Sequence, residues 1–149
     1  MLIKKNKNSL RGKIEINNLT RFAVDKTFFV GVAKKVLKGE NRGTENLSIA
    51  FVNTSKIQDL NKKYRKKDKP TDVLSFEKVL GFKGEMSEII ICPEVVKKQS
   101  KDLKVNLKKA LTEVLIHGIL HTLGYDHDIS KLEEERMFKK QEYYLSKIK

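Results

Sequence analysis

The three histidines of the chain fall within the segment 117–127, and their spacing suits a metal site. His117 and His121 are four residues apart, so on a helix of about 3.6 residues per turn their imidazoles project from one face. We expect Gly124 to end this helix in the left-handed conformation, after which the chain can return His127 toward the other two. Three protein ligands leave one coordination position open for water or substrate, as in catalytic zinc sites. The spacing therefore predicts one zinc ion per chain, bound by His117, His121 and His127.

The histidine spacing also occurs in H-E-x-x-H-x-x-G-x-x-H, the signature of the metzincin zinc proteases. Gly118 stands where those proteases carry the glutamate that acts as general base. Because that group activates water for peptide hydrolysis, its loss disfavours a protease. We expect the small Gly118 to leave room beside the metal for a bulkier substrate group. The alternative for the histidines is three unrelated polar or capping residues.

Two carboxylates are candidates for a supporting role at this site, and each has an ordinary alternative. Asp126 could orient a ligand histidine, or it could simply form the turn in which it lies. Glu88 could act as a remote base or position a ligand, or it could be a solvent-exposed carboxylate at the end of a strand.

A basic segment, RKKDKPT at 65–71, is expected to form an exposed loop. Arg65 can donate two parallel hydrogen bonds to a phosphate and keeps its charge at any working pH. Lys66, Lys67 and Lys69 follow it and could track a nucleic-acid backbone. A solvated loop would explain the same lysines.

Composition narrows the class of protein. The 149 residues fit one domain, 1–149, and 32 lysines and arginines against 19 acidic residues give a net charge of +13. This excess favours a polyanionic partner such as a nucleic acid. Apolar runs stay below the roughly 18–20 residues that a membrane span needs, so no membrane association is expected. The single cysteine, Cys92, suits a reducing cytoplasm. No pattern in the chain indicates an oligomeric state.

The elements that would position these residues alternate between strands and helices before a run of three helices. Their bounds follow from apolar periodicity and from capping residues. Ser130, for example, begins a capping box with Glu133. They predict an α+β fold, in which a small mixed sheet of about four strands is packed by helices. The expected elements are strands at 13–16, 47–52, 72–76 and 88–92, and helices at 21–37, 55–64, 93–100, 107–123 and 131–147.

Two stretches closely resemble motifs of the YbeY family of bacterial single-strand-specific endoribonucleases, which act in rRNA maturation. HGILHTLGYDH at 117–127 resembles its H-G-x-L-H-L-x-G-Y-D-H signature, and LNKKYRKKDKPTDVLSF at 60–76 is similar to L-N-x-x-Y-R-x-K-D-x-P-T-D-V-L-S-F. The resemblance covers roughly residues 45–130, and one departure is Ser87, where the family usually has glycine. It implies an α+β fold with a zincin-like metal-site helix, a zinc ion on the three histidines and a functional arginine at Arg65.

The function that this resemblance implies is a zinc-dependent endoribonuclease of single-stranded RNA. Its expected context is the cytoplasm and the small ribosomal subunit, where it would process the 3′ end of 16S rRNA and serve ribosome quality control. Arg65 and His117 would be its catalytic residues, and the nucleophile would be metal-bound water or the substrate's 2′-OH. Two alternatives stay open: an RNA-binding ribosome-assembly factor with a mainly structural metal, and a metallohydrolase of another substrate such as a peptide.

Overall fold

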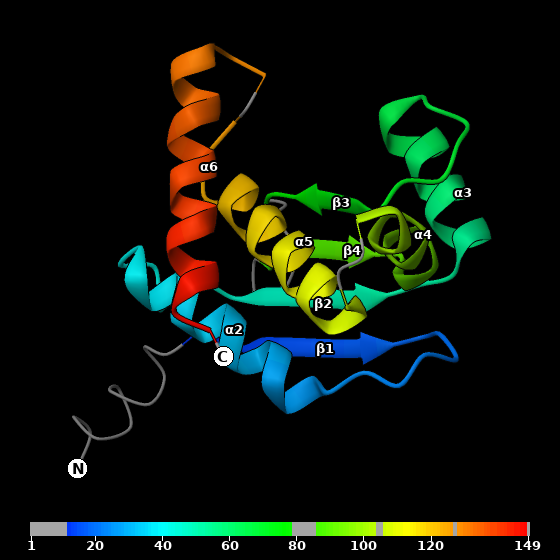
Figure 1. Cartoon of the computed structure of the whole chain (residues 1–149), viewed down its shortest axis with the longest axis horizontal. Helices are drawn as coiled ribbons and strands as arrows, with labels where there is room; N and C mark the ends of the chain where they lie inside the picture. Colours follow the sequence, from blue (N-terminus) through cyan, green and yellow to red (C-terminus); the bar gives the residue numbers. More distant parts are fainter. Residues whose placement is uncertain (1–11, 79–85, 104–105, 127, 149) are drawn as a thin grey trace.

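A computed structural model describes residues 12–78, 86–103, 106–126 and 128–148 of the chain. The described elements follow the order expected from the sequence, with strands and helices alternating before three consecutive helices (Figure 1). Within these residues, no helix is both long and apolar enough to cross a membrane. The elements are β1 (Ile14–Asn18), α2 (Lys26–Gly39), β2 (Leu47–Phe51), α3 (Thr54–Arg65), β3 (Val73–Phe76), β4 (Ser87–Ile91), α4 (Pro93–Leu103), α5 (Leu107–Thr122) and α6 (Lys131–Ser146).

The four strands form one mixed sheet in the order β1-β2-β4-β3. β1 and β4 both run parallel to β2, whereas β3 pairs antiparallel with β4 and forms an edge of the sheet. The expected α+β fold with about four strands in a mixed sheet is therefore confirmed. The antiparallel edge strand is important for the site, because β3 lies beside α5.

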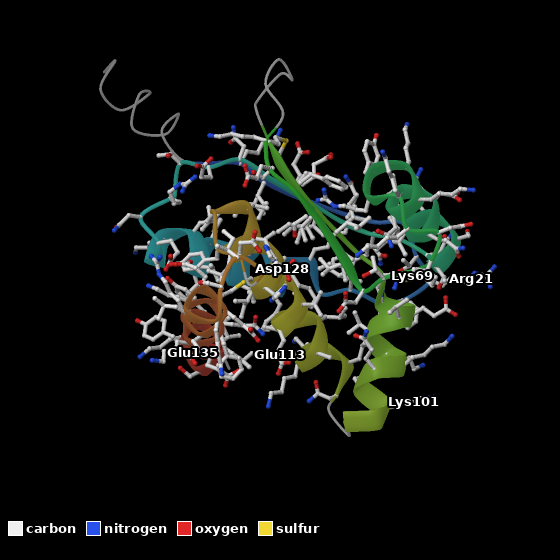
Figure 2. The ribbon with its side chains drawn as sticks, turned by 90° about the horizontal axis from the view of Figure 1, so that it is seen from above. Arg21, Lys69, Lys101, Glu113, Asp128 and Glu135 are labelled. Atoms are coloured by element: carbon white, nitrogen blue, oxygen red, sulfur yellow. The ribbon has the colours of Figure 1, made fainter. Side chains whose placement is uncertain are left out.

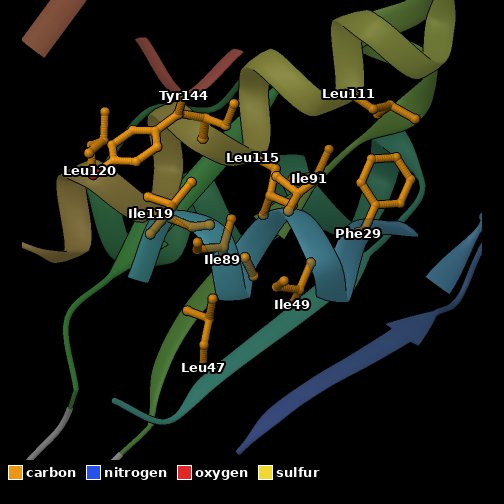
Figure 3. Packing of buried hydrophobic residues seen from close by; sticks show 14 of the residues in the cluster. Phe29, Leu47, Ile49, Ile89, Ile91, Leu111, Leu115, Ile119, Leu120 and Tyr144 are labelled. Atoms are coloured by element: carbon orange, nitrogen blue, oxygen red, sulfur yellow. The ribbon is translucent and has the colours of Figure 1, made fainter. Parts of the chain in front are cut away.

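One face of the sheet packs against α2 and α5 and forms the main core. Alternate residues of the central strands point to this face, as the two-residue period of a strand requires. Figure 3 shows Ile49 and Ile89 meeting Leu115 and Ile119 of α5 in this layer. Because these side chains have no exposed surface, the helix is held firmly against the sheet.

On the opposite face of the sheet, α3 packs beside β3 around a smaller buried cluster. Ile57 of α3 packs there with Val52, Leu74 and Cys92. Cys92, the residue after β4, is fully buried.

The helix expected from Arg21 begins instead at Lys26, so this part of the prediction was wrong. Side-chain hydrogen bonds form a turn there: the Asn18 amide donates to the Phe22 carbonyl, and the Thr20 hydroxyl donates to the Asn18 side-chain oxygen. Such local bonds compete with a helical turn. Asp25 then caps the helix by accepting from the backbone N–H of Phe28.

Gly39 ends α2 at a close contact with α6. It is the last helical residue of α2, and the left-handed residue that follows is Asn41, with φ of 58°. A Cβ on Gly39 would lie 2.5 Å from the hydroxyl oxygen of Tyr144. Gly39 therefore allows α6 to approach α2 closely.

Candidate functional site

Helix α5 presents two histidines on one face. Leu111, Leu115 and Ile119 bury the opposite face of the helix in the core. The rings of His117 and His121 lie with their centroids 4.7 Å apart, and both residues line a cleft. The geometry is that expected for residues four apart on a helix.

The end of α5 reverses the chain as the sequence predicted. Gly124 has φ of +104°, which few residues other than glycine adopt readily. Its backbone N–H donates to the carbonyl of His121, and that of Tyr125 donates to the carbonyl of Leu120. His127, the third expected ligand, lies outside the described residues.

Asp126 forms a turn in the connection between α5 and α6. Its carboxylate accepts a hydrogen bond of 2.8 Å from the backbone N–H of Asp128. This is the turn-forming alternative that the sequence left open. Asp126 also lines the cleft and is half-buried, but no described contact connects it to a histidine.

A network around Glu40 fixes the connection that follows Gly124. Tyr125 donates a hydrogen bond of 2.6 Å to one oxygen of Glu40, while Tyr144 and Lys140 of α6 bind the other. Burial disfavours the charge of Glu40, but these hydrogen bonds outweigh it and hold the pKa of the carboxyl below its ordinary value. Burial, together with the bond to Glu40, raises the pKa of Tyr125 to about 12. The network therefore ties the turn to both α2 and α6 at neutral pH.

One partner of the histidine pair was not predicted from the sequence. Nδ1 of His117 lies 3.0 Å from the side-chain oxygen of Gln141, a residue of α6. Gln141 shares a helix face with the buried residues Met137 and Tyr144. This helical spacing is the only sequence feature that could have indicated that Gln141 faces the core and α5.

Gly118 does not line the cleft, and the expectation that it leaves room for substrate was wrong. A Cβ at this position would lie 3.0 Å from Cγ2 of Ile89 and 3.1 Å from the hydroxyl oxygen of Ser75. The Ser75 hydroxyl also donates to the carbonyl of Gly118 at 3.2 Å. The glycine thus allows α5 to approach β3 and β4 closely.

Arg65 ends α3 and is held against the edge strand. It donates a hydrogen bond of 2.8 Å to the carbonyl of Ser75, and its guanidinium carbon lies 4.9 Å from the centre of the Phe76 ring. The residue is exposed and lines the same cleft as the histidines. Stacking on an aromatic ring suits a guanidinium that must keep one orientation.

The basic loop after Arg65 is ordered by two features. Lys66 adopts the left-handed conformation that ends α3, with φ of 58°. Asn61, which is only 3% exposed, donates to the carbonyl of Lys69 at 2.9 Å. These features direct Lys67 and Lys69 to the cleft, whereas Lys66 is not among its lining residues.

The cleft has a volume of about 1180 Å³ and joins distant parts of the chain. Figure 2 labels Lys69, from the loop after α3, and Asp128, from the connection after α5, which both line it. Its charge is mixed, because acidic residues accompany the cations. The described charged residues that line it are Arg65, Lys67, Lys69, Asp72, Glu77, Asp126 and Asp128.

Glu88 is not brought to this site. It is exposed, and it alternates along β4 with Ser87 and Ile89, which are buried on the α5 side of the sheet. Its side chain therefore points to the opposite face from the histidines. The solvent-exposed alternative describes its position.

The donor set is suited to a zinc-like ion. Imidazole nitrogen is a preferred ligand of zinc, although it also suits other transition metals. His117 and His121 project together into an open cleft, and Gln141 holds one ring by its other nitrogen, as ligand histidines commonly require. No group of three or more metal-binding side chains occurs among the described residues, which exclude His127.

Comparison with known proteins agrees with this architecture. A family model described as endoribonuclease YbeY matches residues 11–149. A protein named endoribonuclease YbeY from Thermotoga neapolitana is 40% identical over 106 residues, covering 71% of this chain and 69% of its own. One of that name from Aquifex aeolicus is 32% identical over 148 residues, covering 97% and 95%.

A solved structure supports the same relationship. The solution structure of a Thermotoga maritima protein matches 91% of this chain and 88% of its own, with a TM-score of 0.60 and 30% sequence identity. The family match extends well beyond the two motifs that first suggested it, to nearly the full sequence. The chain therefore belongs to the YbeY endoribonuclease family.

Proposed function

We propose that this protein is a metal-dependent endoribonuclease that cuts single-stranded RNA. One zinc ion per chain would be held by His117, His121 and His127. The observation that carries the proposal is the meeting of two sets of groups in one cleft: the histidine pair of α5, and Arg65 with Lys67 and Lys69 from the loop after α3. Family membership supplies the class of reaction.

The basic residues would bind the RNA backbone. Arg65 keeps its charge throughout the working pH range and offers several parallel N–H donors, which suit the scissile phosphate. Its bond to Ser75 and its contact with Phe76 hold the guanidinium at the edge of the cleft. Lys67 and Lys69 would neutralise neighbouring phosphates.

His117 and His121, together with His127, would hold the metal in the same cleft. A bound zinc ion supplies Lewis-acid polarisation of a phosphoryl oxygen and lowers the pKa of bound water toward neutrality. The acidic residues Asp126 and Asp128 also line the cleft and would favour a cation there. Arg65 would stabilise the charge that develops on the phosphate in the transition state.

Peptide hydrolysis is a poorer fit to the same cleft. Gly118 occupies the position of the protease general base, and the space at that position is filled by Ile89 and Ser75. A metalloprotease would therefore need a base from another element.

We further propose that the substrate is ribosomal RNA in the cytoplasm. Maturation of the 3′ end of 16S rRNA and ribosome quality control are the processes implied by the motif resemblance, with the small ribosomal subunit as partner. The net charge of +13 favours such a polyanionic partner.

The test is cleavage of labelled RNA oligonucleotides of one sequence, single-stranded or annealed to a complement. The zinc-loaded protein should cut the single strand in preference to the duplex, and a chelator should stop the reaction. Arg65→Ala should lose cleavage while keeping its zinc. Folded, zinc-loaded protein that leaves RNA intact would refute the nuclease proposal, and cleavage of a peptide instead would move the activity to another substrate.

A further inference from the structure

We propose that Gln141 is a positioning residue that sets the tautomer of His117 and thereby presents its Nε2 to the metal. The proposal rests on the metal site proposed above. It concerns a contact between α5 and α6 in which the α6 residue lies outside both motifs. Gln141 lies on α6, 24 residues after His117.

The geometry of the contact determines which ring nitrogen carries the proton. The side-chain oxygen of Gln141 lies 3.0 Å from Nδ1 of His117, and an amide oxygen can only accept a hydrogen bond. A neutral imidazole has one N–H, so this bond places the proton on Nδ1. The Nε2 lone pair is then the one that a metal can use.

The reverse orientation of the amide would have the opposite effect. If the amide NH₂ faced Nδ1, that nitrogen would accept a hydrogen bond and the proton would reside on Nε2. A protonated Nε2 cannot bind a metal. Metal binding through Nε2 therefore requires the orientation seen here, in which the oxygen of Gln141 faces His117.

The rest of α6 holds Gln141 at this point. Met137 and Tyr144, one turn before and after it, are each only 2% exposed, and they lock the same helix face into the core. Glu40 accepts hydrogen bonds from Tyr144 and Lys140, which flank Gln141 in the helix. The position of the amide is therefore determined by the packing of the whole helix.

The neutral amide of Gln141 also affects the basicity of the His117 imidazole. Many ligand histidines donate to a carboxylate, which raises their basicity. An amide oxygen polarises the ring less, so the metal keeps more of its Lewis acidity. Gln141→Glu would strengthen the acceptor with little change in volume, and Gln141→Leu would remove it.

Two measurements test the proposal without relying on activity. Zinc affinity is measured by competition with a chromophoric chelator. The His117 tautomer is measured by long-range ¹H–¹⁵N NMR on metal-free protein at about pH 8, where imidazoles of ordinary pKa are neutral. Gln141→Leu should bind zinc about 10–100-fold more weakly and lose the preference for a proton on Nδ1. Gln141→Glu should keep that tautomer and bind zinc at least as tightly as the wild type.

Gln99→Leu is the matched control, because Gln99 of α4 lines a neighbouring cavity of about 250 Å³ together with His117 and Gln141. It should leave both zinc affinity and tautomer unchanged. The proposal would be overturned if Gln141→Leu kept the wild-type tautomer and zinc affinity. Weaker zinc binding by Gln141→Glu would also overturn it, and this variant stays informative if the leucine variant does not fold. A wild type that binds no zinc would refute the metal site, whereas the tautomer of the metal-free protein would still test the role of Gln141.

Discussion

Replacement of Gly118 by alanine should destabilise the protein, although alanine is the better helix former. The new Cβ would lie 3.0 Å from Cγ2 of Ile89 and 3.1 Å from the hydroxyl oxygen of Ser75. Ile89 has no exposed surface and lies in the centre of the core, so it has little freedom to move. The helix must shift away from β3 and β4, and it carries His117 and His121 with it.

The size of the effect follows from two opposing contributions. Overpacking a buried position costs about 1–3 kcal/mol, while replacing an interior helical glycine by alanine gains about 1 kcal/mol. Gly118→Ala should therefore change the free energy of unfolding by about 0 to −2 kcal/mol. Gly31→Ala in α2 is the matched control, since a Cβ there meets nothing within 4 Å. It should gain the full helical contribution of about 1 kcal/mol.

Urea denaturation of the two variants and the wild type, without metal, measures this difference. A double-mutant cycle with Ile89→Ala should show positive coupling, because removing Cγ2 relieves the clash. The reasoning would be refuted if Gly118→Ala were stabilised as much as Gly31→Ala. Zinc affinity of Gly118→Ala would then show whether the shift of α5 also disturbs the two histidines.

Three further predictions concern the cleft and the network beneath it. Arg65→Ala should reduce RNA cleavage by at least about 10²-fold with unchanged zinc content, and a smaller loss would remove Arg65 from the reaction. Lys67→Gln should make the dependence of log RNA affinity on log salt concentration shallower by about 0.7, whereas Lys66→Gln, outside the cleft lining, should not. Because the pKa of Glu40 is lowered, its stabilising contribution is full above the ordinary value of 4.5 and is lost as pH falls through the folded value. Glu40→Gln should therefore lower stability at neutral pH and weaken its fall in acid, and an unchanged pH profile of the free energy of unfolding would contradict this.

The local sequence predicted those parts of the structure that depend on short-range spacing. The 3.6-residue period placed His117 and His121 on one face of α5, and Gly124 follows the end of this helix with the expected positive φ. The strand and helix order was also confirmed. The start of α2 was misplaced because Asn18 and Thr20 form side-chain bonds that an apolar period does not contain.

Long-range packing decided the features that the sequence could not predict. Gln141 reaches His117 from another helix, so its role depends on how α6 packs. Gly118 was expected beside the substrate, but the rotation of α5 against the sheet turns it toward Ile89. Glu88 was a candidate from the sequence, but the alternation of side chains along β4 places it on the opposite face of the sheet from the histidines. Each outcome depends on which side of an element faces the site.

The most direct test of the central claim measures zinc content and cleavage of single-stranded RNA in the same preparations. Wild type is compared with His121→Ala, which removes one imidazole of the pair on α5. We expect about one zinc per wild-type chain and RNA cleavage, and the loss of both in a variant that remains folded. A variant that keeps its zinc, or one that loses zinc and still cuts RNA, would contradict a metal centre at these histidines.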